Sequence, residues 1–245
     1  SVLEAVKPLK EKYPLEVAFG MADPETIKEA VRKLEEKGVS DVIAVPLFIS
    51  SHSPIIGNSC YILGLQEKLP ETTSIKSLPR IKSKLKFYMT GAMDDSVLIA
   101  EILMERAKEH SAEPFKETVI IVGHGPNDEK ENRLWLDNME RLAQYVHEKG
   151  KFKEVKVATW RSDAPEDIRN KAIRELTTMV KIGGEDGRVI VVPLLLAPCA
   201  VEMEIVEALK GLSYAYSGKT LLPHDNITKW IKTKVEEELM KSVEE

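Results

Sequence analysis

The sequence predicts an α/β protein of two similar lobes, each a parallel four-stranded sheet flanked by helices, with a cleft between the lobes. Two observations support this prediction. In the second half of the chain, β-branched runs alternate with stretches of helical periodicity, as in successive βα units. The first half repeats the same order of segments, and a repeat constrains many positions at once. We place the two lobes at residues 1–112 and 113–245.

The second half is the easier to interpret, because each apolar strand is followed by a regular helical pattern. Strands and helices that alternate in this way form a parallel sheet covered by helices on both faces. The predicted segments, in chain order, are strand 118–122, helix 128–148, strand 155–159, helix 165–180, strand 188–195, helix 201–209, a weak strand 217–222 and helix 225–240.

Three pairs of similar segments align the two halves. VAFGMADPETI beside VATWRSDAPEDI pairs Val17 with Val157, and VIAVPLF beside VIVVPLL pairs Pro46 with Pro193. KFYMTGAMDDSVLIAEILMERA and GKTLLPHDNITKWIKTKVEEEL each contain a strand, a polar turn and a closing helix. The first copy begins at a helix over residues 1–12, so we expect the strand that precedes this helix in the second copy to be missing.

Composition argues against several classes of function. A net charge of −5 provides no basic face in bulk for neutralising phosphates, so we expect no nucleic-acid partner. No apolar run reaches the roughly 18 residues that span a bilayer and no signal peptide opens the chain, so we expect no membrane partner. Two cysteines are too few for a disulfide framework and favour a cytoplasmic location. No glycine-rich fingerprint follows a strand, which argues against a nucleotide cofactor.

Reactive side chains follow several predicted strands, at the edge where parallel α/β sheets bind their ligands. His124 lies between two glycines in IIVGHGPND, where a tight turn leaves its imidazole open to a ligand. His52 and Cys199 each stand six residues after the proline of their strand and offer good ligands for borderline divalent metals. The alternatives are ordinary loop histidines and, for Cys199, a small inert thiol.

Three further residues are candidates for handling a substrate. Glu202, three residues after Cys199, is placed to accept protons as a general base, although a carboxylate at a helix start also stabilises the helix dipole. Arg161 follows a strand and is expected either to bind a carboxylate or to form a surface ion pair. His224 follows the fourth strand and is expected at the rim of the site.

Taken in order, these segments resemble the class II chelatases, the family of sirohydrochlorin cobaltochelatases and ferrochelatases, in its duplicated form. The resemblance covers nearly the whole chain and rests on VIIVGHG, VPLFISSHS, VVPLLLAPC and the Asp/Ala-Pro-Glu entry to each middle helix. It implies a flat tetrapyrrole in the cleft between the lobes and a divalent metal ion (cobalt, iron or nickel) as substrate. It also implies the loss of two pyrrole protons as the metal enters.

In this family the metal-binding histidines follow the first and third strands of a lobe. His124 matches the first-strand histidine and His52 the third, whereas Cys199 stands where a histidine is expected. We therefore expect metal binding by His52, His124 and Cys199, catalysis by His124 and Glu202, and substrate binding by Arg161 and His224.

Two other classes compete with this interpretation. A protein with degenerate sites would bind metal or tetrapyrrole without catalysis, and Cys199 keeps this alternative open. A histidine phosphatase would carry an arginine directly before the histidine, where Gly123 stands here. An oligomer is compatible with each of these functions.

Overall fold

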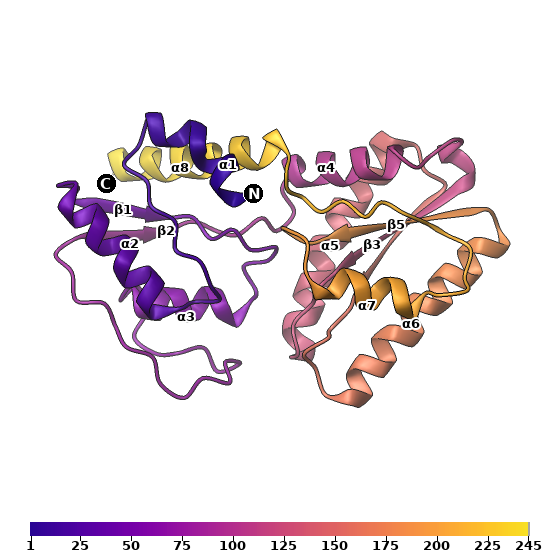
Figure 1. The fold of residues 1–245 in the computed structure, drawn as a ribbon, viewed down its shortest axis with the longest axis horizontal. Helices are drawn as coiled ribbons and strands as arrows, with labels where there is room; N and C mark the ends of the chain where they lie inside the picture. Colours follow the sequence, from indigo (N-terminus) through magenta and orange to yellow (C-terminus); the bar gives the residue numbers. More distant parts are fainter. Residues whose placement is uncertain (245) are drawn as a thin grey trace. The chain divides into compact units, whose positions relative to one another are not determined.

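The computed structural model describes residues 1–244, which form two compact units (Figure 1). Unit 1 comprises Ser1–Ala92 and the chain from Thr228 onward, and unit 2 comprises Met93–Ile227. Each unit contains parallel strands flanked by helices, so the predicted α/β class is confirmed.

The compact units differ from the repeat copies at residues 1–112 and 113–245. Helix α4 (Val97–Lys108), from the first copy, belongs to unit 2, and most of α8 (Asp225–Glu244), from the second copy, belongs to unit 1. Within unit 1, the hydroxyl of Thr228 on α8 donates a hydrogen bond to the carbonyl of Ala5 (2.6 Å). The last helix of each copy therefore packs in the unit that is built mainly from the other copy.

Unit 2 is built on a parallel sheet with the strand order β4-β3-β5-β6. Residues 119–122 of β3 and 189–192 of β5 are fully buried, as expected for the central strands of a parallel sheet. The last strand ends before the predicted segment 217–222, where Gly218 adopts a φ of +59°. The strands are β3 (Glu117–Gly123), β4 (Glu154–Thr159), β5 (Arg188–Leu194) and β6 (Ala215–Tyr216).

Helices cover both faces of this sheet (Figure 1). On one face, α6 (Glu166–Glu185) and α7 (Ala200–Ala208) share a buried apolar cluster with alternate residues of the strands. On the other face, α4 contacts β5 and α5 (Glu129–Gly150) contacts β4. Because helices cover both faces, the central strands of this sheet are open to a ligand at their ends.

A buried carboxylate anchors the start of β3. Glu117 is 2% exposed and accepts hydrogen bonds from the hydroxyl of Ser111 and from the amides of Ala112 (2.9 Å) and Glu113 (3.1 Å). Burial alone would raise the pKa of Glu117, but these hydrogen bonds together hold it below its ordinary value. The ionised carboxylate therefore stabilises the connection between α4 and the sheet.

Unit 1 contains, within its described residues, a two-stranded parallel sheet of β1 (Asp41–Ala44) and β2 (Lys86–Met89). The predicted helix over residues 1–12 is divided into α1 (Val2–Val6) and a 3-10 helix (Lys7–Glu11). Pro8 explains the change, because it lacks the N–H that an α-helix would use there. Two further helices, α2 (Pro24–Glu36) and α3 (Pro54–Ile62), follow the predicted pattern.

The strand expected around Val17 does not form, so the first lobe has two of its four predicted strands. In unit 2 the equivalent strand β4 is at the edge of the sheet and pairs with β3. Residues 1–244 contain no counterpart of β3 in unit 1. Without that neighbour, the backbone near Val17 has no adjacent strand with which to form a ladder.

Candidate functional site

The carboxyl ends of three adjacent strands meet in unit 2, and a reactive side chain follows each of them. The register of the sheet pairs Gly123 of β3 with the last residues of β4 and β5. His124 comes directly after β3, Asp163 follows β4 and Cys199 follows β5. This is the edge at which parallel α/β sheets bind ligands.

The imidazole of His124 is oriented so that one nitrogen is free for a ligand. Its Nδ1 lies 2.9 Å from the carbonyl oxygen of Gly125. A carbonyl oxygen can only accept a hydrogen bond, so in the neutral imidazole Nδ1 carries the proton and the lone pair is on Nε2. The His124 side chain is 33% exposed.

Asp163 is a functional candidate that the sequence interpretation missed. Its Oδ2 lies 3.4 Å from Nε2 of His124, and its side chain is 71% exposed. The hydroxyl of Ser162 lies 3.5 Å from the same nitrogen. An imidazole nitrogen beside a carboxylate suits a borderline divalent metal. The available signal was that Asp163 is the first carboxylate after β4, at the same edge as His124.

Cys199 and Glu202 lie together at the start of α7. The thiol of Cys199 is exposed, and its backbone amide donates to the Glu202 carboxylate at 3.1 Å. This bond caps the helix, so Glu202 has a structural partner as well as the expected position for a base.

Burial, with the nearby charge of Glu202 contributing, raises the pKa of Tyr216 and keeps its phenol protonated.

Trp160 packs inside unit 2 and is not exposed to a ligand. It is 3% exposed and belongs to the apolar cluster beneath α6 and α7. Its indole N–H donates to the carboxylate of Glu204 at 2.7 Å. Glu204 therefore links α7 to the end of β4.

Arg161 lies beneath the site, and its guanidinium is 6% exposed. Its nitrogens donate to the carbonyls of Pro126 and Asn127 and to the carboxylate of Glu129. Each guanidinium nitrogen is thus engaged once, and the substrate-binding role of Arg161 stays a prediction that would use the remaining N–H groups of its two terminal nitrogens.

His224 also has partners for both ring nitrogens. Its Nδ1 accepts from the amide of Asn226 at 3.1 Å, so Nε2 carries the proton and donates to Glu105 at 2.9 Å. These bonds join the start of α8 to α4 within unit 2. A role for His224 in substrate binding stays a prediction that requires one of these bonds to open.

His52 lies in unit 1, in the turn between β1 and α3. Its amide donates to the hydroxyl of Ser50 at 3.2 Å, and Ser50 is 1% exposed. Ser53 caps α3 through the amide of Ile55. The turn is thus locally ordered around a half-buried imidazole. The expectation that His52 and His124 serve one site stays a prediction.

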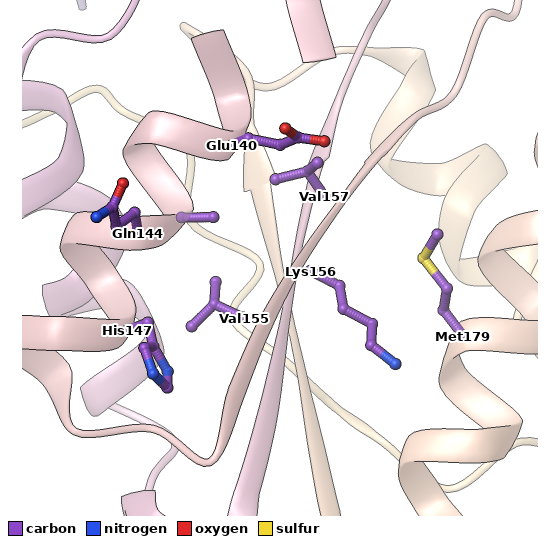
Figure 2. Close-up of a pocket in the computed structure, with 8 residues that line it drawn as sticks. Glu140, Gln144, His147, Val155, Lys156, Val157 and Met179 are labelled. Atoms are coloured by element: carbon purple, nitrogen blue, oxygen red, sulfur yellow. The ribbon is translucent and has the colours of Figure 1, made fainter. Parts of the chain in front are cut away.

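A cavity of about 490 Å³ lies beside β4 but away from these residues (Figure 2). It is lined by the middle of β4 and by α5 and α6 side chains, including Glu140 and His147. These two residues are seven positions apart on α5, about 10 Å along the helix axis, too far to share one metal ion. Across residues 1–244, no group of three or more His, Cys, Asp or Glu side chains is arranged to hold a metal.

No helix within residues 1–244 has the length and apolar character needed to cross a membrane.

Comparison with solved structures supports the fold. The chain is similar to SirB from Bacillus subtilis with Fe3+, at 15% identity and a TM-score of 0.67, covering 96% of this chain and 87% of that chain. It is also similar to DR2241 from Deinococcus radiodurans, described as a multi-domain protein with structural similarity to chelatases, at 15% identity and a TM-score of 0.52. That match covers 95% of this chain and 49% of DR2241.

No curated protein sequence matches this chain at a significant level. The family model CbiX, in contrast, matches residues 1–110 and again residues 118–238. The two matches follow the internal repeat, and together they cover most of the chain. The protein therefore belongs to the CbiX family, in a duplicated form with the fold of the chelatases.

Proposed function

We propose that this protein inserts a divalent metal ion, Co²⁺ or Fe²⁺, into sirohydrochlorin or a related tetrapyrrole. The observation that carries the proposal is the pair formed by His124 and Asp163. In a chain of the CbiX family, an imidazole Nε2 with a free lone pair lies 3.4 Å from an exposed carboxylate at the ligand-binding edge of the sheet. Such a pair can hold a metal ion while leaving coordination positions open for pyrrole nitrogens.

The metal ion is a substrate, so the site has to release it as well as bind it. A site whose protein ligands do not all bind the ion at once suits this requirement, because a closed set of four ligands characterises structural metal sites. Imidazole and carboxylate accept iron, cobalt and nickel with affinities that follow the intrinsic order of the metals. The similarity to SirB, whose structure was solved with Fe3+, supports iron as one substrate.

Metal insertion releases two protons, since M²⁺ replaces the two pyrrole N–H hydrogens of the ring. We assign proton acceptance to Glu202, whose carboxylate lies at the start of α7 after β5. Cys199 and His52 are proposed as further metal ligands, and His224 as a rim residue. The reaction takes place, on this proposal, in the cytoplasm.

The test is anaerobic incubation of the protein with sirohydrochlorin and Co²⁺, Fe²⁺ or Ni²⁺, followed by visible absorbance. Insertion by the wild-type protein and its loss in His124→Ala and Asp163→Asn would support the proposal. A wild-type protein that accelerates insertion of none of the three metals would refute it.

A non-catalytic binding protein is the second candidate, and one observation favours it. The Glu202 carboxylate is already engaged by the amide of Cys199 at 3.1 Å, and Cys199 itself replaces an expected histidine. A protein of this kind would bind Co²⁺ or the tetrapyrrole in equilibrium experiments but would leave the insertion rate at its uncatalysed value. Glu202→Gln separates the two candidates, because it slows insertion without weakening metal binding only if Glu202 is the base.

A further inference from the structure

We infer that Arg161 is a positioning residue, which holds the loop carrying His124 and so sets the direction of the Nε2 lone pair. This inference rests on the proposed function, because it gives Arg161 a part in metal binding through His124. Arg161 touches neither nitrogen of the imidazole, and its effect passes through the backbone of the loop.

Three hydrogen bonds join the Arg161 guanidinium to one short segment. Its Nε donates to the carbonyl of Pro126 at 2.9 Å, one terminal nitrogen donates to the carbonyl of Asn127 at 2.6 Å, and the other donates to the Glu129 carboxylate at 2.7 Å. These acceptors lie between His124 and the first turn of α5. A planar guanidinium presents its donors on three nitrogens in a fixed fork, whereas the three donors of lysine share one nitrogen and cannot reproduce this spread.

The guanidinium of Arg161 is a buried charge that depends on its hydrogen bonds to the loop. The Arg161 side chain is 6% exposed, while its partner Glu129 is 64% exposed. A buried charge is tolerated where it is hydrogen-bonded, and here each of the three guanidinium nitrogens makes one hydrogen bond. Loss of these acceptors would leave a buried positive charge without hydrogen bonds and would destabilise the folded loop.

The backbone of Arg161 is also hydrogen-bonded to the loop that carries His124. Its amide donates to the carbonyl of His124 at 2.6 Å, and Arg161 itself has a φ of +56°, a conformation that non-glycine residues rarely adopt. Residues held in this region cluster at functional sites, where the surrounding structure maintains them. The strained backbone and the buried side chain thus hold the two ends of the His124 turn together.

Gly125 allows the loop that carries His124 to pack closely against Thr159 and Arg161. It has a φ of +73°, and a Cβ at this position would lie 2.5 Å from Cβ of Thr159 and 3.1 Å from Cγ of Arg161. The loop after β3 therefore rests directly on the residues that follow β4. Because the Gly125 carbonyl accepts the Nδ1 proton of His124, a shift of this loop would turn the imidazole. Residues that orient a metal ligand in this way contribute roughly 10-fold to 100-fold to metal affinity or activity.

The experiment compares Arg161→Lys with a matched control, Arg141→Lys. Arg141 lies on α5 in the same unit, is 63% exposed and pairs with Asp95 at the surface. We expect the Arg161→Lys protein to bind Co²⁺ about 10-fold or more weakly by isothermal titration calorimetry, with an altered visible spectrum of the bound Co²⁺. The control should match the wild type in both measurements. All titrations are made at a temperature at which circular dichroism shows each variant to be folded.

Arg161→Gly is the second variant, in case lysine prevents folding, because glycine accepts the positive φ while removing the guanidinium. Wild-type Co²⁺ affinity and spectrum in the folded Arg161→Lys or Arg161→Gly protein would overturn the inference. His124→Ala gives the reference for complete loss of the ligand. If His124→Ala itself binds Co²⁺ normally, His124 is not a ligand and the proposed function fails at that step, a result distinguishable from failure at Arg161 alone.

Discussion

Replacing Gly125 by alanine should destabilise unit 2, because the new methyl group has no room. The added Cβ would lie 2.5 Å from Cβ of Thr159 and 2.9 Å from its Cγ2, distances that force one of the groups to move. Thr159 cannot move freely, since its hydroxyl donates to the buried amide oxygen of Asn132 at 2.8 Å. Arg161, the other neighbour, is held by its three guanidinium bonds.

Two contributions set the magnitude of this effect. A φ of +73° costs a residue with a Cβ about 1–2 kcal/mol relative to glycine. Overpacking a filled site adds about 1–3 kcal/mol. Gly211 provides the matched control, because it has a φ of +85° but no atom within 4 Å of the position of its Cβ. Gly211→Ala should therefore show only the backbone contribution.

Urea unfolding measures the difference between the two variants. Trp135 and Trp160 lie in unit 2, whereas Trp230 lies in unit 1, so a Trp230→Phe background restricts the fluorescence signal to unit 2. We expect the free energy of unfolding to fall further in Gly125→Ala than in Gly211→Ala, by about 1–3 kcal/mol. Equal losses in the two variants would refute the close contact between the His124 loop and the end of β4.

Four other predictions follow from the structure. His124→Ala should abolish metal insertion while changing the free energy of unfolding by less than about 0.5 kcal/mol, because the side chain lies in a partly exposed loop; urea unfolding and absorbance assays test both parts. Glu117→Gln should lower the free energy of unfolding at neutral pH by about 1–3 kcal/mol. Because the pKa of Glu117 is lowered in the folded protein, the extra stability of the wild type is full above the ordinary pKa of the carboxyl group and is lost as the pH falls through the folded pKa. Unfolding curves recorded across acidic pH measure this difference. Iodoacetamide should label the exposed Cys199 before Cys60, because burial raises the pKa of the Cys60 thiol, and Co²⁺ should slow labelling of Cys199 if it is a ligand. Arg161→Gly should be more stable than Arg161→Ala by roughly 1–2 kcal/mol, because only alanine keeps the unfavourable positive φ; thermal unfolding compares them.

The fold was predictable wherever hydrophobic periodicity alone determines an element. β3 and β5 are continuous apolar runs, and they form the buried centre of the unit 2 sheet as predicted. The strand around Val17 carries the same local pattern as β4 and still does not form, because a strand needs a hydrogen-bonding neighbour as well as a suitable sequence. Pro8 had a local effect that the apolar pattern did not convey, since it changes the first helix to a 3-10 turn.

The candidate site was predictable in its location but less so in its members. The residues that directly follow parallel strands lie at one edge of the sheet, so sequence position alone places His124 and Cys199 at that edge. The short distance between His124 and Asp163 could not be predicted from the sequence, because it depends on how the loops after two different strands pack together. The hydrogen-bond partners of Arg161 and His224 could not be predicted either, since both side chains bond to residues far away in the chain.

By itself, the sequence determined the α/β class, the internal repeat, the family resemblance and the presence of ligand-type residues after the strands, because these depend on periodicity and local spacing. Only the tertiary structure decided which unit each terminal helix joins, which imidazole nitrogen of His124 is free, and that Arg161 is buried under the loop. These features depend on contacts between segments distant in the sequence, where packing and hydrogen-bond geometry select one arrangement among many that the same local patterns allow.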